Sequence, residues 1–446
     1  MNRVLAGLLA LTLSCALPLD SPACKRVEPV ACPNCFAVFV MPDTQNYVYE
    51  TSQPHAGNHL DLIARYICAH RTRWIEPSTG KQMPILMTIQ LGDLVQRADG
   101  STVRPNREEW ERIDGAFDVL DQCDPPVPYV VTVGNHDLAL TTYESASRFY
   151  NEYFGVERWA DQGYRCTTPG DCDWDAGQWF VGGGDPIQPR SRNNLGAGNP
   201  GPPTRQPGRH RAARIISPNG QPFLFLGLEI AFDFPPVPKS LQRIQGNDAA
   251  WPEQILSLYP DTPTIVFHHS MLWAFPAPDD RLRWGPEVWL SDSIQPPPPH
   301  SRQREFGEEG GMEALYQRLI APYPQARFLF TGHVIRPRTQ ADYTIDREAG
   351  GPVWAFLRNY QNRPLPANPS SGYGAGWNVI AVFDPDAQQV RVRSYRIDDE
   401  AGYASPPTNF AHKGEPAPTE CFDMDEGGIP ERTLSWDFQV QRAPAP

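Results

Sequence analysis

The stretch Ile85-Leu-Met-Thr-Ile-Gln-Leu-Gly-Asp93 decides the fold. Its first six residues are a largely apolar run bounded by turn residues, which fits a buried strand. The run is followed by Gly92-Asp93, where glycine allows a sharp turn and a carboxylate then stands at the end of the strand. A buried strand that ends in a polar group is typical of α/β proteins.

The same pattern recurs along the chain. Segments whose apolar residues repeat at helical spacing predict helices at Leu60–Arg73, Glu108–Gln122 and Gly311–Ile320. Apolar runs predict further strands at Phe36–Met41, Tyr129–Val133, Phe223–Glu229, Thr264–Phe267, Phe328–Phe330, Val353–Phe356, Trp377–Phe383 and Val390–Ile397. Strands that alternate with helices favour an α/β sandwich.

Polar residues follow several of these strands directly. They are Asp43-Thr44-Gln45, Gly92-Asp93, Gly134-Asn135-His136-Asp137, His268-His269 and Gly332-His333. Taken singly, each block also fits an ordinary turn or a hydrogen-bonded polar pair. Together, at the carboxyl ends of strands where open α/β sheets bind ligands, they indicate one pocket. Carboxylates, imidazoles and an amide in one pocket suit a divalent transition metal.

These blocks resemble those of the calcineurin-like metallophosphoesterases, which read DxH, GDxxD, GNHD/E, a histidine after a strand, and GHxH. The stretches Arg358-Asn359-Tyr360-Gln361 and Gly374-Ala375-Gly376-Trp377 resemble a bacterial branch that begins with DTQ in place of DxH. The resemblance covers about residues 36–397. It implies a four-layer α/β/β/α sandwich of the metallophosphoesterase type with long Pro/Gly-rich loop insertions, and two metals bridged by Asp93.

The resemblance also implies the ligands of each metal. One metal would be held by Asp93, Asn135, His268 and His333, with His269 as the alternative to His268. The other would be held by Asp43, Gln45 and Asp93.

Two departures from the family pattern weaken the second site. Gln45 stands where the family has a histidine, and Ile335 replaces the second histidine of GHxH. A neutral amide is a poor ligand for zinc or iron but is tolerated by manganese, magnesium and calcium. We therefore expect one tightly held divalent metal (Mn, Fe or Zn) and a second that is weak, different (Mg or Ca) or absent.

The implied activity is hydrolysis of a phosphomonoester or phosphodiester by water that a metal activates. The substrate would be a phosphoester small molecule or a phosphorylated substrate. His136 would protonate the leaving group, although Gln96 replaces the aspartate that usually orients it, so Asp137 or Asp99 would have to take that place. The expected substrate contacts are Arg358, Asn359 and Gln361. Tyr47, Tyr360 and Trp377 are aromatic candidates, although aromatic residues on strands more often belong to the core.

An alternative function is that of a degenerate family member, a metal-stabilised envelope or surface binding protein. Its basis is the departures at Gln45, Gln96 and Ile335. Other classes of enzyme find little support, because the chain has no GxSxG and no Gly-rich P-loop around Gly80-Lys81.

Composition narrows the classes of partner. The 52 acidic residues exceed the 39 basic ones, so general nucleic-acid binding is not expected, whereas a local metal would still allow a phosphate-bearing substrate. The 49 prolines predict long surface loops, notably Gly182–Arg214 and Pro276–Gly311. The arginines of the first loop would either attract anions or simply be solvated.

The N-terminal residues 1–23 are expected to be a signal peptide, with a lipoprotein signal that ends at Ser14 as the alternative. The protein would then be exported (periplasmic, outer-membrane lipoprotein or secreted), and would contact a membrane only through a lipid anchor. Residues 36–400 would form the metallophosphoesterase domain, and residues 401–446 a Pro-rich extension packed on its surface.

The nine cysteines also fit an oxidising compartment. Cys68 and Cys123 each end a predicted helix and are expected to pair, and Cys166 is expected to pair with Cys172. Cys24, Cys32, Cys35 and Cys421 would tie the two termini together.

Overall fold

A computed structural model of the chain includes most of the strands and helices that the sequence predicts. The described residues are 28–49, 56–76, 78–96, 107–134, 136–137, 149–150, 152–155, 158, 179–183, 210–228, 250–273, 283–284, 312–333, 340–348, 350–360, 377–397 and 432–435.

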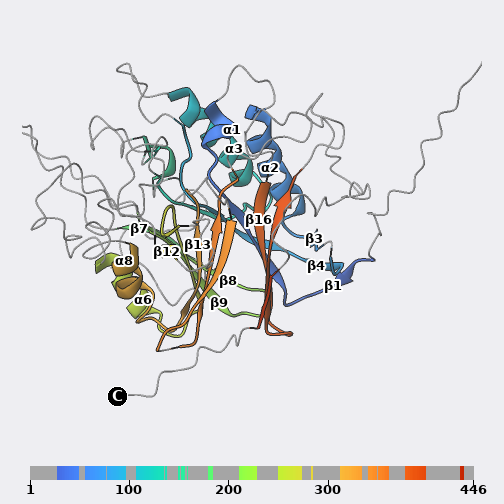
Figure 1. Cartoon of the computed structure of the whole chain (residues 1–446). Helices are drawn as coiled ribbons and strands as arrows, with labels where there is room; N and C mark the ends of the chain where they lie inside the picture. Colours follow the sequence, from blue (N-terminus) through green and yellow to red (C-terminus); the bar gives the residue numbers. More distant parts are fainter. Residues whose placement is uncertain are drawn as a thin grey trace, which may run out of the picture.

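Two large β-sheets form the centre of the protein (Figure 1). The strand order of the first is β18 (Arg432–Ser435), β17 (Gln389–Arg396), β16 (Trp377–Asp384), β2 (Phe36–Met41), β5 (Ile85–Gln90) and β6 (Tyr129–Val131). The strand order of the second is β14 (Gln340–Ile345), β15 (Val353–Arg358), β13 (Ala326–Thr331), β10 (Thr264–His268), β9 (Pro222–Leu228), β8 (His210–Ile216) and β7 (Trp179–Gly183). Strands β2, β5 and β6 are parallel to one another, and so are β9, β10, β13 and β15.

Helices cover the outer faces of both sheets. The first group consists of α1 (Gln45–Tyr49), α2 (Ala56–His70) and α3 (Arg107–Asp121), which pack on one another. The second group consists of α6 (Ala250–Leu258) and α8 (Met312–Leu319), which lie on the opposite side of the paired sheets (Figure 1). None of the helices within the described residues has the length and apolarity that crossing a bilayer requires.

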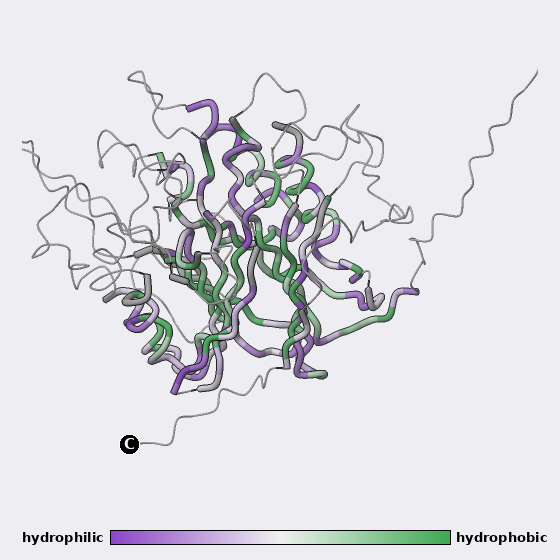
Figure 2. Tube along the Cα trace, in the orientation of Figure 1, coloured by the Kyte–Doolittle hydropathy of each residue, from purple (hydrophilic) through white to green (hydrophobic). Residues whose placement is uncertain are grey.

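The residues of β9 show why the second sheet packs against the first sheet on one face and against helices on the other. Side chains alternate along a strand, so Phe223 and Phe225 join the core shared with the first sheet, whereas Leu224 and Leu226 join the core beneath α6 and α8. The ring of Phe223 lies 4.8 Å from that of Phe36 on β2. Apolar residues accordingly concentrate in the strands at the centre of Figure 2. The predicted α/β sandwich is confirmed.

Most predicted elements are confirmed to within a few residues, and two loop predictions are wrong in part. Strand β8 begins within the end of the predicted loop Gly182–Arg214. Strand β12 (Arg283–Trp284) lies inside the predicted loop Pro276–Gly311 and pairs with β11 (Leu272–Trp273), which precedes that loop. The guanidinium of Arg211 on β8 is buried over the ring of Tyr150. Arg211 therefore does not belong to an exposed anion-attracting loop.

A small sheet flanks the first large one. Its strand order is β1 (Val30–Ala31), β4 (Lys81–Met83) and β3 (Trp74–Ile75). The buried carboxylate of Glu76, just after β3, accepts two bonds of 2.8 and 2.6 Å from the guanidinium of Arg391 on β17. This bidentate pair fixes the small sheet to the large one.

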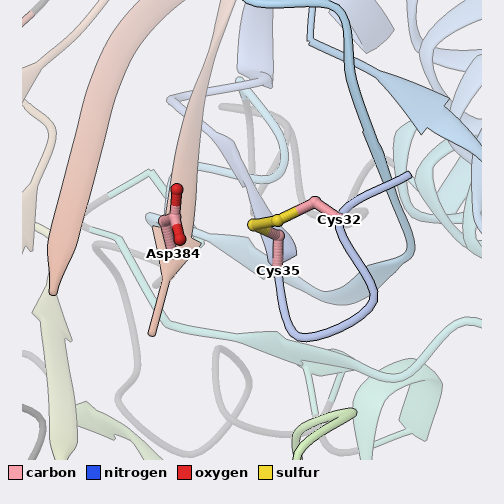
Figure 3. Close-up of side chains that lie close together, drawn as sticks. All are labelled: Cys32, Cys35 and Asp384. Carbon is pink, nitrogen blue, oxygen red and sulfur yellow. A yellow bond between two sulfur atoms is a disulfide. The ribbon is translucent and has the colours of Figure 1, made fainter. Parts of the chain in front are cut away.

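Two disulfides lie within the described residues. Cys68 in α2 is bonded to Cys123, which follows α3, as predicted. Cys32 is bonded to Cys35, so the prediction that both tie the termini together is wrong: their positions at the two ends of a tight turn bring the sulfurs next to each other. Asp384 lies beside this disulfide (Figure 3), but sulfurs in a disulfide are not the thiolates that bind metals. Cys24, Cys166, Cys172 and Cys421 lie outside the described residues.

Candidate metal site

The carboxyl ends of the parallel strands bring several of the predicted site residues together. Asp43 follows β2, Asp93 follows β5, His269 follows β10 and His333 follows β13. The side chains of Asp43, Asp93 and His269 are buried. The two sheets therefore deliver carboxylates and imidazoles to one point from opposite sides of the sandwich.

The centre of the site is formed by Asp93, His269 and His333. The Nε2 atom of His269 lies 3.3 Å from Oδ2 of Asp93 and 3.1 Å from Nδ1 of His333. One ligand atom from each of the three residues lies within 4.8 Å of the others. Two imidazoles and a carboxylate at this spacing are a suitable donor set for a divalent transition metal.

The orientation of the His269 ring also fits a metal ligand. Its Nδ1 atom lies 2.8 Å from the carbonyl oxygen of Leu91, to which it donates. In the neutral ring this leaves the lone pair on Nε2, the atom that points toward Asp93 and His333. Histidines that bind metals are commonly fixed in this way by a carbonyl on the other ring nitrogen.

Asp43 lies next to this centre and is held by several donors. Its Oδ2 atom accepts bonds from the backbone N–H of His333 at 3.0 Å and from Nδ2 of Asn359 at 2.6 Å. Its Oδ1 atom lies 3.7 Å from Nδ1 of His269. Asp43 therefore links the turn that carries His333 to the end of β15.

The backbone is strained at two of these residues. Asp93 has φ 53° and His333 has φ 68°, in the left-handed region that residues other than glycine seldom adopt. Such positions cost on the order of 1–3 kcal/mol and cluster at functional sites. The bond from the His333 N–H to Asp43 and the one from the His136 N–H to Oδ1 of Asp93, 2.9 Å long, hold the strained turns in place.

Two glycines allow the site to be this compact. A Cβ atom on Gly134 would lie 2.1 Å from both the backbone nitrogen and Oδ1 of Asp93. A Cβ atom on Gly332 would lie 2.1 Å from Oδ1 of Asp43. Any side chain at either position would displace a carboxylate of the site.

The electrostatics indicate groups arranged for a cation. Burial lowers the pKa of His269, but the carboxylates of Asp93 and Asp43 outweigh it and raise this pKa to about 9. Burial raises the pKa of Asp43 well above its ordinary value. Burial likewise acts to raise the pKa of Asp93, but His269 and His136 hold that pKa below its usual range. A divalent cation among these groups would favour neutral imidazoles and ionised carboxylates.

The geometry favours His269 over His268 as the candidate metal ligand. His268 is the last residue of β10, and its side chain follows Val266 toward the core beneath α6 and α8, where its Nδ1 atom accepts the N–H of Ser270 at 3.0 Å. His269 follows Phe267 toward the other sheet and meets Asp93. A shift of one residue along a strand changes the face, which is why adjacent histidines have different surroundings.

The other predicted residues have different surroundings. Gln45 is buried in the first turn of α1. Arg358 is buried and forms a 2.6 Å ion pair with Asp342, and Asn359 contacts Asp43, so both have structural partners where substrate contacts were expected. Tyr47 and Tyr360 are buried in the core, with Trp377 packed against it. Asn135, Gln361 and Asp99 lie outside the described residues.

His136 is held by an acceptor that the sequence did not indicate. Its Nδ1 atom lies 2.9 Å from the backbone carbonyl oxygen of Gln96. Asp137, considered above as its partner, instead accepts the N–H groups of Leu94, Val95 and Gly134 at 2.7, 3.1 and 2.7 Å. Burial and the charge of Asp93 raise the pKa of Asp137 to about 7, against these donors.

A matched pair of variants tests which histidine binds the metal. His269→Asn keeps a polar group near the Leu91 carbonyl but removes Nε2. We expect the affinity for the metal to fall by roughly 10-fold to 100-fold or more, and the metal content of the purified variant to fall with it. His268→Asn keeps an acceptor for the Ser270 N–H, so we expect its metal content to stay at the wild-type level. Elemental analysis of both purified variants gives the answer, and the opposite ranking would restore His268 as the ligand.

Comparisons with known proteins give similarities in sequence and in structure. No family model matches the sequence. The chain is 24% identical over 358 residues to the uncharacterized protein YvnB of Bacillus subtilis (strain 168), an alignment that includes 80% of this chain and 19% of that protein. The chain thus spans about a fifth of the length of this relative. The structure of a 5'-nucleotidase from Candida albicans SC5314 aligns with a TM-score of 0.36 and 13% identity, over 84% of this chain and 50% of that one.

Proposed function

We propose that the protein is a metal-dependent hydrolase of phosphomonoesters or phosphodiesters. The observation that carries the proposal is the approach of His269 Nε2 to Asp93 Oδ2 and His333 Nδ1, at 3.3 and 3.1 Å. These three residues would hold a divalent cation, which would supply Lewis-acid chemistry at a phosphoryl oxygen and lower the pKa of water.

The chain's own residues set the geometry of the reaction. Asp93 would offer Oδ2 to the cation, and its Oδ1 atom accepts the backbone N–H of His136. The Nδ1 atom of His136 is held by the Gln96 carbonyl, so Nε2 is the ring atom that would face the leaving oxygen. An imidazolium in that place would donate its proton as the phosphorus–oxygen bond breaks.

We propose that the site binds one metal ion tightly. The Oδ2 atom of Asp43 already accepts two hydrogen bonds, and Gln45 offers a neutral amide. These groups are therefore weak ligands for a second ion of the same kind. A second ion would be manganese, magnesium or calcium rather than zinc.

Export is part of the same proposal. The Cys32–Cys35 and Cys68–Cys123 disulfides fit a protein that matures in an oxidising compartment. The signal peptide proposed at residues 1–23 would lead the chain there.

The test is hydrolysis of p-nitrophenyl phosphate and bis-p-nitrophenyl phosphate by the purified protein, with bound metal counted in parallel. We expect a chelator to abolish hydrolysis and added Mn²⁺ to restore it as about one equivalent binds. Hydrolysis that a chelator leaves unchanged would contradict the metal-dependent mechanism. Absence of both hydrolysis and bound metal would favour the binding-protein alternative.

A further inference from the structure

Glu109 is a carboxylate that the metal site does not account for. It lies in the first turn of α3 and is 0% exposed. Its neighbours on the buried face of α3 are apolar, namely Trp110, Ile113, Ala116, Phe117 and Leu120. A carboxylate inside an apolar stripe is costly to bury unless it is hydrogen-bonded, so its partner is informative.

The partner of Glu109 leads to His136. An oxygen of Glu109, Oε2, accepts the backbone N–H of Gln96 at 2.9 Å. The carbonyl oxygen of the same Gln96 lies 2.9 Å from Nδ1 of His136. One backbone residue is thus fixed at its N–H by Glu109 and presents its carbonyl to the imidazole.

The rest of this segment is held in the same manner. The preceding N–H groups, of Leu94 and Val95, donate to Oδ1 of Asp137 at 2.7 and 3.1 Å. Three consecutive N–H groups after Asp93 therefore end on buried carboxylates, two on Asp137 and one on Glu109. These three hydrogen bonds to buried acceptors fix the position of the segment.

We propose that Glu109 is a positioning residue for His136 and acts through the carbonyl of Gln96. This inference rests on the proposed function, in which His136 assists the leaving group. The Gln96 carbonyl takes the place of a side-chain carboxylate as acceptor for Nδ1. Because a carbonyl oxygen only accepts, the bond requires hydrogen on Nδ1 and directs the reactive position to Nε2.

The geometry separates this role from metal binding. Glu109 contacts the Gln96 N–H, whereas the metal group consists of Asp93, His269 and His333. Loss of Glu109 should therefore loosen His136 and leave the metal content unchanged.

The kinetic test compares two substitutions of Glu109 in the full chain loaded with Mn²⁺. Glu109→Met removes the acceptor at similar length and is expected to lower kcat by roughly 10-fold to 100-fold with little change in KM, as loss of a positioning partner does. Glu109→Gln keeps an oxygen acceptor for the Gln96 N–H and is expected to recover most of kcat. Glu111→Met, an exposed site on the same helix, is the matched control.

A double-mutant cycle with His136→Ala separates positioning from general damage. If Glu109 acts through His136, Glu109→Met lowers kcat in the wild-type background and has almost no effect when His136 is already absent. Equal losses in both backgrounds, with metal content and melting temperature unchanged, would overturn the proposal.

A spectroscopic readout keeps the inference independent of the proposed activity. In the protein labelled with ¹⁵N-histidine, the Nδ1–H of His136 should give a slowly exchanging proton signal that His136→Ala removes. We expect this signal to persist in Glu109→Gln and to be lost in Glu109→Met. Its persistence in Glu109→Met would refute the positioning role, even if no hydrolysis were found. Its loss in a protein without hydrolysis would uphold the role and reject only the function.

Discussion

Asp93→Asn should release the bound metal and slow phosphoester hydrolysis on the order of 10³-fold, the scale of losing several kcal/mol of Lewis-acid stabilisation. The Oδ2 atom of Asp93 faces His269 at 3.3 Å, and Oδ1 accepts the His136 N–H at 2.9 Å. Asparagine has nearly the same shape and can still accept one bond. The substitution therefore removes the negative charge and leaves the turn largely intact.

Metal content, kcat and the melting temperature of Asp93→Asn are measured against Asp386→Asn. Asp386 accepts exposed bonds from Asn34, far from the site in the sequence, so its substitution is the control. If Asp93→Asn has activity near the wild-type level, with or without added Mn²⁺, then this carboxylate does not hold the catalytic metal.

Gly134→Ala should lower kcat on the order of 10²-fold or more, because a misplacement of about 1 Å at a reacting centre already slows a reaction by this factor. The new Cβ would lie 2.1 Å from the backbone nitrogen and Oδ1 of Asp93, closer than any real contact. Asp93 must therefore shift, and its bonds to the metal and to His136 shift with it.

The matched control is Gly115→Ala in α3. A Cβ atom at this position would meet nothing within 4 Å. In a helix interior, alanine is more stable than glycine by about 0.5–1 kcal/mol. We expect Gly115→Ala to keep full activity and to raise the melting temperature slightly. Full activity and metal content in Gly134→Ala would mean that the turn relaxes without disturbing Asp93, and would contradict the close packing described above.

The fold was predictable because each strand carries a strong local signal. Ile85–Gln90 is largely apolar, and its predicted bounds agree with those of β5. The sequence did not predict β8, because it contains Arg211 and Arg214, and the burial of Arg211 depends on a contact with the distant Tyr150. Local polarity suggested a loop, whereas a tertiary contact satisfies the guanidinium.

The site was predictable in location but not in detail. Strand ends indicated the pocket, but the choice between His268 and His269 depends on the strand face at the point where β10 ends. Glu109 left one signal that could have been used, a carboxylate within the apolar stripe of a helix. The Gln96 carbonyl left none, because a backbone acceptor has no sequence signature.

The position of β2 within its sheet has a consequence for how the chain acquires its fold. This early strand is hydrogen-bonded on one side to β5 and on the other to β16, where Val38 pairs with Ala381, and Phe36 stacks on Phe383 at 4.8 Å. Pairing between such distant segments makes folding slow, because a long loop must close before the contacts form. During synthesis, β2 would keep one edge unpaired until β16 has been made. An unpaired apolar edge invites aggregation, so we expect a nascent chain that stops before residue 377 to depend on chaperones.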